Sequence, residues 1–323
     1  MKKSFITTWV FLLLSVILNG YGYSACEGDI NCSGTVDGSD LALLAADFGT
    51  TGCGTCDDVA TLIDELEDRI AQLEALLQNV TRNGDNIYIN GANLHIRDGS
   101  GTTYGAVNGL GNLIVGYNES RVPYGGTDDR TGSHNIVVGD YQNFSSYGGL
   151  VAGSYNTINE GWASVSGGRF NTVSGYAGSV SGGSYNTASR ICSSVTGGRY
   201  NTASGDYAFV GGGGGELESD GNEAFADYSS ILGGWRNIAG DPNFLSTSLG
   251  TQSVVSGGSS NIASGDRSAV SGGYDNVASG AGASVSGGKD GVASALGASV
   301  SGGNYTTVDD NYDWAAGDLY EPE

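Results

Sequence analysis

From about residue 110 onward, apolar and small polar residues recur in a unit of about 15 residues. Three clear copies begin at Ser164, Ser179 and Ser194 with Ser-Val-Ser/Thr-Gly-Gly, and each continues with two variable residues and Asn-Thr. The inward apolar column contains Val165, Val180, Val195, Val255, Val270, Val285 and Val300, with weaker or stretched copies centred on Ile114, Val137, Val151, Val210 and Ile231. A constant period of this kind is typical of a solenoid, in which each repeat forms one coil.

Each repeat can be assigned to one coil of a parallel β-roll. Ser-Val-Ser predicts a short strand with Val inward, Gly-Gly predicts a turn, and Asn tolerates left-handed geometry and can form a ladder with the next Asn. A second strand turns inward Val173, Ala188, Ala203, Ala263, Ala278 and Ala293, and a small residue closes the coil at Gly178, Ser193, Ala208, Ser268, Ala283 and Ala298. Insertions near Gly212 to Asp227 and Asp241 to Ser248 are predicted to leave the stack as loops. The expected fold is therefore an all-β parallel β-solenoid over residues 111–308, followed by an acidic tail at 309–323.

The composition is consistent with stacked small side chains. Glycine accounts for 57 of 323 residues, and large aliphatic residues are sparse outside the first third of the chain. One coil buries a valine and a few small groups, which at roughly 25 cal/mol per Å² offsets little of the entropy lost on ordering the coil. Three rolls packed around one axis would bury a second face. We therefore expect a homotrimer.

A heptad pattern precedes the repeats, in residues 57–82. Its two core columns are Ile63, Ile70 and Leu77 in one position and Val59, Leu66, Leu73 and Val80 in the other. Alternating spacings of four and three predict a short coiled coil, and Ile and Leu at these positions allow a dimer or a trimer. A single amphipathic helix packed on its own chain is the alternative. Residues 83–110 are expected to be a β-rich connector.

The first residues are typical of an export signal. Lys2 and Lys3 precede an apolar run from Trp9 to Leu18, so residues 1–25 are expected to be a signal peptide. Cleavage before a lipidated Cys26 is the alternative, and the later sequence contains no segment that predicts a membrane-spanning helix. The net charge of −22 argues against nucleic acid as a partner. We expect an extracellular or cell-surface protein.

Residues 29–40 have the spacing of a calcium-binding loop. Oxygen ligands fall at alternate positions, with Gly34 at the sharp turn; the six expected ligands are Asp29, Asn31, Ser33, Asp37, Asp40 and, through its backbone carbonyl, Thr35. Ca²⁺ is the one cofactor that the sequence predicts. Cys26, Cys32, Cys53 and Cys56 surround the loop and favour two disulfides of undetermined pairing over a zinc site. The role of Cys192 is left open.

Two families resemble parts of the chain. With Asp40 at the last loop position and Val36 four residues before it, residues 26–50 resemble one type I dockerin repeat. That resemblance implies cohesin binding, although dockerins carry two such repeats. The repeats of residues 110–308 resemble the heads of YadA-like trimeric autotransporter adhesins, which implies a left-handed trimeric roll that adheres to a host, glycan or other surface. In this chain the predicted coiled coil precedes the head, the inverse of the family's order.

Candidate binding residues are aromatic, and no constellation predicts catalysis. Phe170, Tyr185 and Tyr200 occupy one repeat position, with Tyr155 and Trp235 nearby in register and Arg169 and Arg199 beside them. They are expected either to stack as a stabilising ladder, which we favour, or to bind sugars or a protein. The acidic residues Glu216, Glu218, Asp220 and Glu223 are assigned to an insertion, and His95 and His134 stand alone. We expect a non-catalytic protein.

Overall fold

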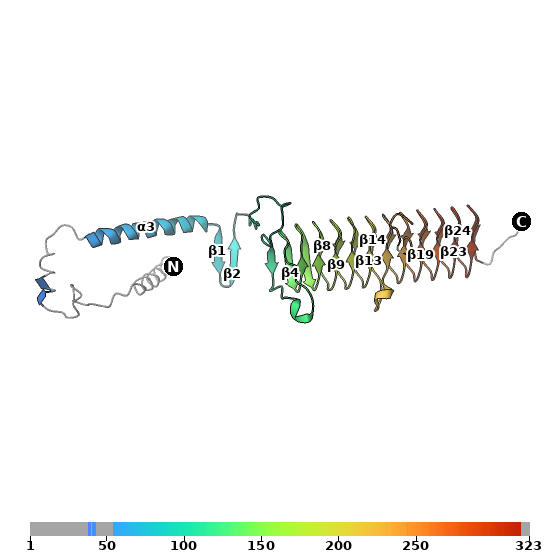
Figure 1. Ribbon diagram of the computed structural model, residues 1–323, viewed down its shortest axis with the longest axis horizontal. Coiled ribbons are helices and arrows are strands. Elements are labelled where there is room, and N and C mark those ends of the chain that lie inside the picture. Colours follow the sequence, from blue (N-terminus) through green and yellow to red (C-terminus); the bar gives the residue numbers. More distant parts are fainter. Residues whose placement is uncertain (1–37, 40, 43–53, 244, 318–323) are drawn as a thin grey trace. The chain divides into compact units, whose positions relative to one another are not determined.

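The computed structural model describes residues 38–39, 41–42, 54–243 and 245–317, which fall into two units divided between Leu94 and His95 (Figure 1). In the first unit, α3 (Gly54–Leu76) is followed by an antiparallel hairpin of β1 (Val80–Asn83) and β2 (Asn86–Ile89). Gly84, at a φ of 58°, begins the two-residue turn between the strands. The helix ends before Leu77, so the predicted seam is helical only as far as Leu73, and Val80 begins a strand instead.

The second unit is a parallel β-solenoid, which confirms the predicted architecture. Its first sheet, here called the Val sheet, contains β3 (Leu113–Val115), β4 (Ile136–Asp140), β6 (Leu150–Ser154), β8 (Ser164–Val165), β10 (Ser179–Val180), β12 (Ser194–Val195), β14 (Phe209–Val210), β16 (Ser230–Ile231), β18 (Val254–Val255), β20 (Ala269–Val270), β22 (Ser284–Val285), β24 (Ser299–Val300) and β26 (Trp314–Ala315). Each strand pairs in parallel with the equivalent strand of the next coil. The stack extends beyond the predicted boundary, because β26 lies in the segment predicted as an acidic tail.

The second sheet, here called the Ala sheet, contains the other strand of each coil. Its members are β5 (Asn143–Phe144), β7 (Thr157–Ile158), β9 (Thr172–Val173), β11 (Thr187–Ala188), β13 (Thr202–Ala203), β15 (Glu223–Ala224), β17 (Ile238–Ala239), β19 (Ile262–Ala263), β21 (Val277–Ala278), β23 (Val292–Ala293) and β25 (Thr307–Val308). Short 3-10 helices η1 (Val122–Tyr124) and η2 (Glu218–Asp220) leave the regular coils. In Figure 1 both lie along the lower edge of the solenoid.

The core is a row of small apolar side chains between the two sheets. The predicted valines are buried, as are Ala188, Ala203 and the other inward residues of the Ala sheet. The closing positions also carry buried small residues, among them Ser193, Ala208 and Ala298. Most side chains that meet across the core are Val or Ala, so the two sheets can approach closely; the larger buried residues Phe144, Ile158 and Ile231 are the exceptions.

A ladder of buried asparagines runs along one corner, as the sequence predicts. Asn186 is typical: its backbone N–H donates to Oδ1 of Asn171 at 3.0 Å, and its Nδ2 donates to the carbonyls of Gly182 and Gly198, each at 3.0 Å. The members from Asn156 onward are Asn156, Asn171, Asn186, Asn201, Asn222, Asn237, Asn261 and Asn276, all buried. Since both the amide and the carbonyl of each side chain have partners, these buried polar groups stabilise the stack.

The left-handed backbone lies one residue earlier than predicted. It falls on the residue before each Asn, with φ values of 56° at Phe170, 58° at Tyr185 and 60° at Tyr200. The Asn itself must direct its N–H toward the previous Asn and its side chain into the corner. The residue before it therefore adopts the left-handed conformation that turns the chain.

The first insertion is shorter than the sequence suggested. It is confined to the turn between β14 and β15, because Glu223 and Ala224 form β15 and pair with Thr202 and Ala203. The second lies in the opposite turn, between β17 and β18. The spacing of apolar residues located the two insertions in the repeat array. It could not show at which residue the next strand, β15 or β18, begins.

Candidate functional site

The candidate site is the row of aromatic residues that precede the Asn ladder, here called the aromatic edge. Phe170, Tyr185 and Tyr200 are each carried by a turn that follows a Gly-Gly pair, whereas Tyr155 follows the single glycine Gly153. At Gly168, whose φ is 81°, a Cβ would collide with the carbonyl oxygen of Gly183 in the next coil, so only glycine fits. Because successive turns approach so closely, the aromatic side chains at the same position of successive coils lie one strand spacing apart. Flat rings stack at about this separation.

The structure brings four of the five predicted residues into one stack. Ring centroids are 4.9 Å apart for Tyr155 and Phe170, 4.8 Å for Phe170 and Tyr185, and 4.8 Å for Tyr185 and Tyr200, with interplanar angles of 26°, 9° and 21°. Tyr141, which sequence reasoning missed, extends the stack at 4.4 Å from Tyr155. It precedes Tyr155 by 14 residues rather than 15, so it falls outside the strict period.

Trp235 does not belong to this stack. Arg236 occupies the ladder position before Asn237, with a φ of 55°, and its guanidinium lies 4.7 Å from the centre of the Trp235 ring. Trp235 is instead in register with Ser259, one position earlier in the turn. The insertion that contains η2 lies between Tyr200 and this coil, so the aromatic edge ends at Tyr200.

Arginines border the aromatic edge. Arg199 lies 5.8 Å from the centre of the Tyr185 ring and 5.0 Å from that of Tyr200. Arg121, which the sequence did not single out, lies 5.6 Å from the Tyr155 ring and donates to the carbonyl of Asn156 at 2.6 Å and to Oγ1 of Thr157 at 3.0 Å. Because Arg121 joins η1 to two coils, it acts as a clamp, whereas Arg169 is exposed beside the rings.

The geometry of the aromatic edge supports a stabilising ladder. The ring faces are occupied by one another or by Arg199, so mainly ring edges and hydroxyls remain for solvent. Sugars usually stack on an open aromatic face. A ligand at this edge would therefore have to contact ring edges and the guanidinium of Arg169.

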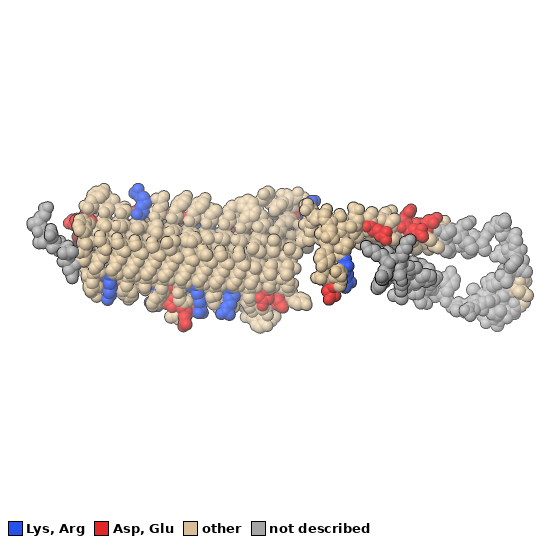
Figure 2. Space-filling model, turned by 180° about the vertical axis from the view of Figure 1, so that it is seen from behind, with Lys and Arg blue, Asp and Glu red and all other residues tan. Residues whose placement is uncertain are grey.

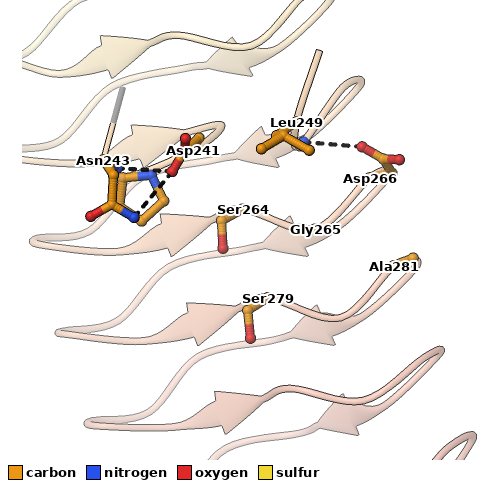
Figure 3. A pocket seen from close by; sticks show the side chains of 10 residues that line it. Asp241, Asn243, Leu249, Ser264, Gly265, Asp266, Ser279 and Ala281 are labelled. Carbon is orange, nitrogen blue, oxygen red and sulfur yellow. Dashed lines mark hydrogen bonds between the residues drawn. The ribbon is translucent and has the colours of Figure 1, made fainter. Parts of the chain in front are cut away.

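Figure 3 shows a second feature, an open pocket beside the second insertion. Asp241 accepts hydrogen bonds from the backbone N–H groups of Asn243 at 2.9 Å and Leu245 at 3.0 Å, and these bonds hold the pKa of its carboxyl below the ordinary value. Asp266 accepts from the N–H groups of Gly250 and Thr251, at 3.0 and 3.1 Å. Both carboxylates therefore serve to fold the insertion.

Glu223 is the one of the four acidic residues assigned to the first insertion that lies in a sheet. Its side chain extends from the outer face of the Ala sheet between Thr202 and Ile238, where Ser204 donates a hydrogen bond to it. Burial raises its pKa to about 7, although the hydrogen bonds from Ser204 and Thr202 lower it. This carboxyl titrates in a range where ordinary glutamates are already charged.

We expect Glu223 to make the stability of the solenoid depend on pH. The folded chain binds this proton more tightly than the unfolded chain, whose Glu pKa is about 4.3, so stability falls as the pH rises from about 4 to 7. E223Q should therefore raise the free energy of unfolding at pH 8 by roughly 1–3 kcal/mol and change it little at pH 4. Denaturant titrations at both values would measure this difference. The exposed Glu216 provides the control, and an equal effect of E216Q at pH 8 would contradict the prediction.

The predicted calcium ligands lie outside the described residues, as do Cys26, Cys32 and Cys53, so calcium and the disulfides stay predictions. Gly38, Ser39, Leu41 and Ala42 are helical, close to where the loop hypothesis begins its helix. Cys56 lies in α3, and Cys192 is exposed with a free thiol. In the part of the chain that the structure describes, no three His, Cys, Asp or Glu side chains group to hold a metal ion.

None of the described helices is both long and apolar enough to cross a membrane. Comparison with protein-family models finds no match to this chain. A search of curated proteins also finds no significant relative.

Proposed function

We propose that the chain is an exported, non-catalytic structural or adhesive element that works as a homotrimer of left-handed β-rolls at the cell surface or outside the cell. The observation that carries this proposal is the apolar seam of α3. Ile63 and Leu73 are 48% and 57% exposed, although they belong to a regular heptad. Such a seam is stable in water when it packs against identical helices.

The surface of the solenoid supports the same proposal. From β8 to β24 the outward residues at the first strand position of the Val sheet are Ser164, Ser179, Ser194, Phe209, Ser230, Val254, Ala269, Ser284 and Ser299, none of which is charged. Figure 2 shows a broad face almost free of Lys, Arg, Asp and Glu, whose side chains gather along the edges. Interface cores are depleted in charged residues, so a flat and uncharged face suits contact between rolls.

We expect the signal-free protein to have three times the mass of one chain in light scattering, both with calcium and with a chelator. I63D should dissociate it, because a charge in the seam of a coiled coil is desolvated, while the β-sheet circular dichroism remains. A71D places the same charge on the same helix outside the heptad seam and should leave the mass unchanged. A monomeric or dimeric mass for the unsubstituted protein would rule out the trimer.

The alternative function is a dockerin-type, calcium-dependent binding module in an extracellular complex associated with polysaccharide. It is favoured by the ligand spacing from Asp29 to Asp40. Calcium-dependent capture by a panel of cohesins or a glycan array would support it. If the light-scattering mass falls to that of one chain only when chelator is present, the calcium loop would instead be what controls assembly.

A further inference from the structure

The hairpin of β1 and β2 has an aliphatic face and a polar face. Cross-strand partners point to the same side of a hairpin, and successive residues of a strand alternate between its two sides. The register pairs Val80 with Ile89, Thr81 with Tyr88, Arg82 with Ile87 and Asn83 with Asn86. One side therefore carries three aliphatic residues, Val80, Ile87 and Ile89, and here we call it the hairpin face. The opposite side carries Thr81, Asn83, Asn86 and Tyr88.

The hairpin face is open to solvent in a single chain. Val80, Ile87 and Ile89 are 40%, 72% and 43% exposed. The fourth residue on this side, Arg82, donates from Nε to the carbonyl of Gly84 at 2.8 Å, so its side chain folds toward the turn rather than over the aliphatic residues. A two-stranded hairpin is at best marginally stable in water, and an aliphatic face on one side of it needs a partner.

The size of the hairpin face limits what can cover it. A stable interface between two proteins buries on the order of 1,000 Å² or more, which three aliphatic side chains do not supply by themselves. The hairpin face must therefore belong to a larger apolar surface.

The apolar surface next to it in the chain is the seam of α3. The N–H of Leu77, just after the helix, donates to the carbonyl of Leu73 at 3.0 Å, and the N–H of Val80 donates to the carbonyl of Leu77 at 2.8 Å. The strand thus begins within one tight turn of the helix end, as Figure 1 shows. Val80 also falls in the heptad column of Leu66 and Leu73, so that column leads directly into the hairpin face.

We propose that the hairpin face packs against the same face of the other two chains, so that three hairpins close one end of the coiled coil. This inference rests on the proposed homotrimer. The three aliphatic residues of each chain meet around the common axis and lose their contact with water, while the polar side of each hairpin stays solvated. The hairpins thereby lengthen a heptad seam that is short by itself.

The test measures how fast a thiol at position 87 reacts with a maleimide in the signal-free chain. Ile87 is 72% exposed in one chain, so a cysteine there reacts quickly unless other chains cover it. At a concentration where light scattering gives the mass of three chains, we expect I87C to react at least about tenfold more slowly than T81C. T81C is the matched control, because Thr81 is exposed on the polar side of the same hairpin. Peptide mass spectrometry separates these thiols from the native cysteines.

Adding I63D, which is expected to dissociate the chains, should restore fast labelling of I87C. If circular dichroism shows that I87C does not fold, I89C on the same face takes its place. Labelling of I87C as fast as T81C in a protein of three-chain mass would overturn the hairpin contact but not the trimer. Slow labelling that persists in monomeric I63D/I87C would show that one chain covers the face by itself, which also overturns the proposal. A mass of one or two chains for the unsubstituted protein would instead rule out the trimer, and this contact with it.

Discussion

Replacing Asn186 with alanine is expected to lower the free energy of unfolding by about 3–5 kcal/mol, a large effect for a single polar side chain. The substitution removes the acceptor of the Asn201 N–H, at 3.0 Å, and the donor to the carbonyls of Gly182 and Gly198. Ser184 also donates to Gly198, but the Asn201 N–H has no other acceptor and lies in a buried corner. Leaving such a group without a partner costs about 1–3 kcal/mol, and the cavity left by the side chain adds to it.

Denaturant unfolding followed by circular dichroism measures this loss. Asn304 is the matched control, because it lies in a turn near the end of the stack and its side chain is exposed. N304A should change stability by about 0.5 kcal/mol or less. Equal effects of the two substitutions would show that the buried ladder contributes no more than a surface amide.

Replacing Gly183 with alanine is expected to destabilise the solenoid by about 3–6 kcal/mol, or to prevent that coil from forming. The φ of Gly183 is +83°, where a Cβ is strained, and that Cβ would point at the carbonyl oxygen of Gly198 in the next coil. This oxygen accepts hydrogen bonds from Ser184 and Asn186, so it cannot move away without breaking the contact between coils. One methyl group would therefore disturb both the turn and the ladder.

The neighbouring glycine provides the control for this prediction. A Cβ at Gly182 would meet nothing within 4 Å, and its φ is not in the left-handed region. G182A should be neutral within about 1 kcal/mol, or slightly stabilising because alanine restricts the unfolded chain. Thermal unfolding of the pair measures the difference. A destabilisation of similar size in G182A would mean that the turn requires two glycines for a reason other than crowding.

The period of the repeat was enough to predict the solenoid. Val165, Val180 and Val195 recur every 15 residues, and a chain with so few large apolar side chains can bury them only by stacking equivalent coils. The buried Asn ladder followed from the same register, because identical residues at a fixed spacing must lie above one another. Phe170, Tyr185 and Tyr200 were predicted for that reason, with Tyr155 and Trp235 expected nearby in register; Tyr155 joins the stack, whereas Trp235 lies one position too early in its turn.

Only the tertiary structure decided the positions of residues that do not follow the 15-residue repeat. Glu223 forms a strand rather than a loop, because the coil resumes at Asn222 and places the next residue against Thr202. Tyr104 contacts the rings of Tyr147 and Trp162 across more than 40 residues, and no repeat relates Tyr104 to them. Sequence periodicity determines contacts between equivalent positions, since each coil imposes its geometry on the next. Contacts between insertions, the leading loop and the coils depend on where the folded backbone carries them, as the contacts of Tyr104 with Tyr147 and Trp162 show.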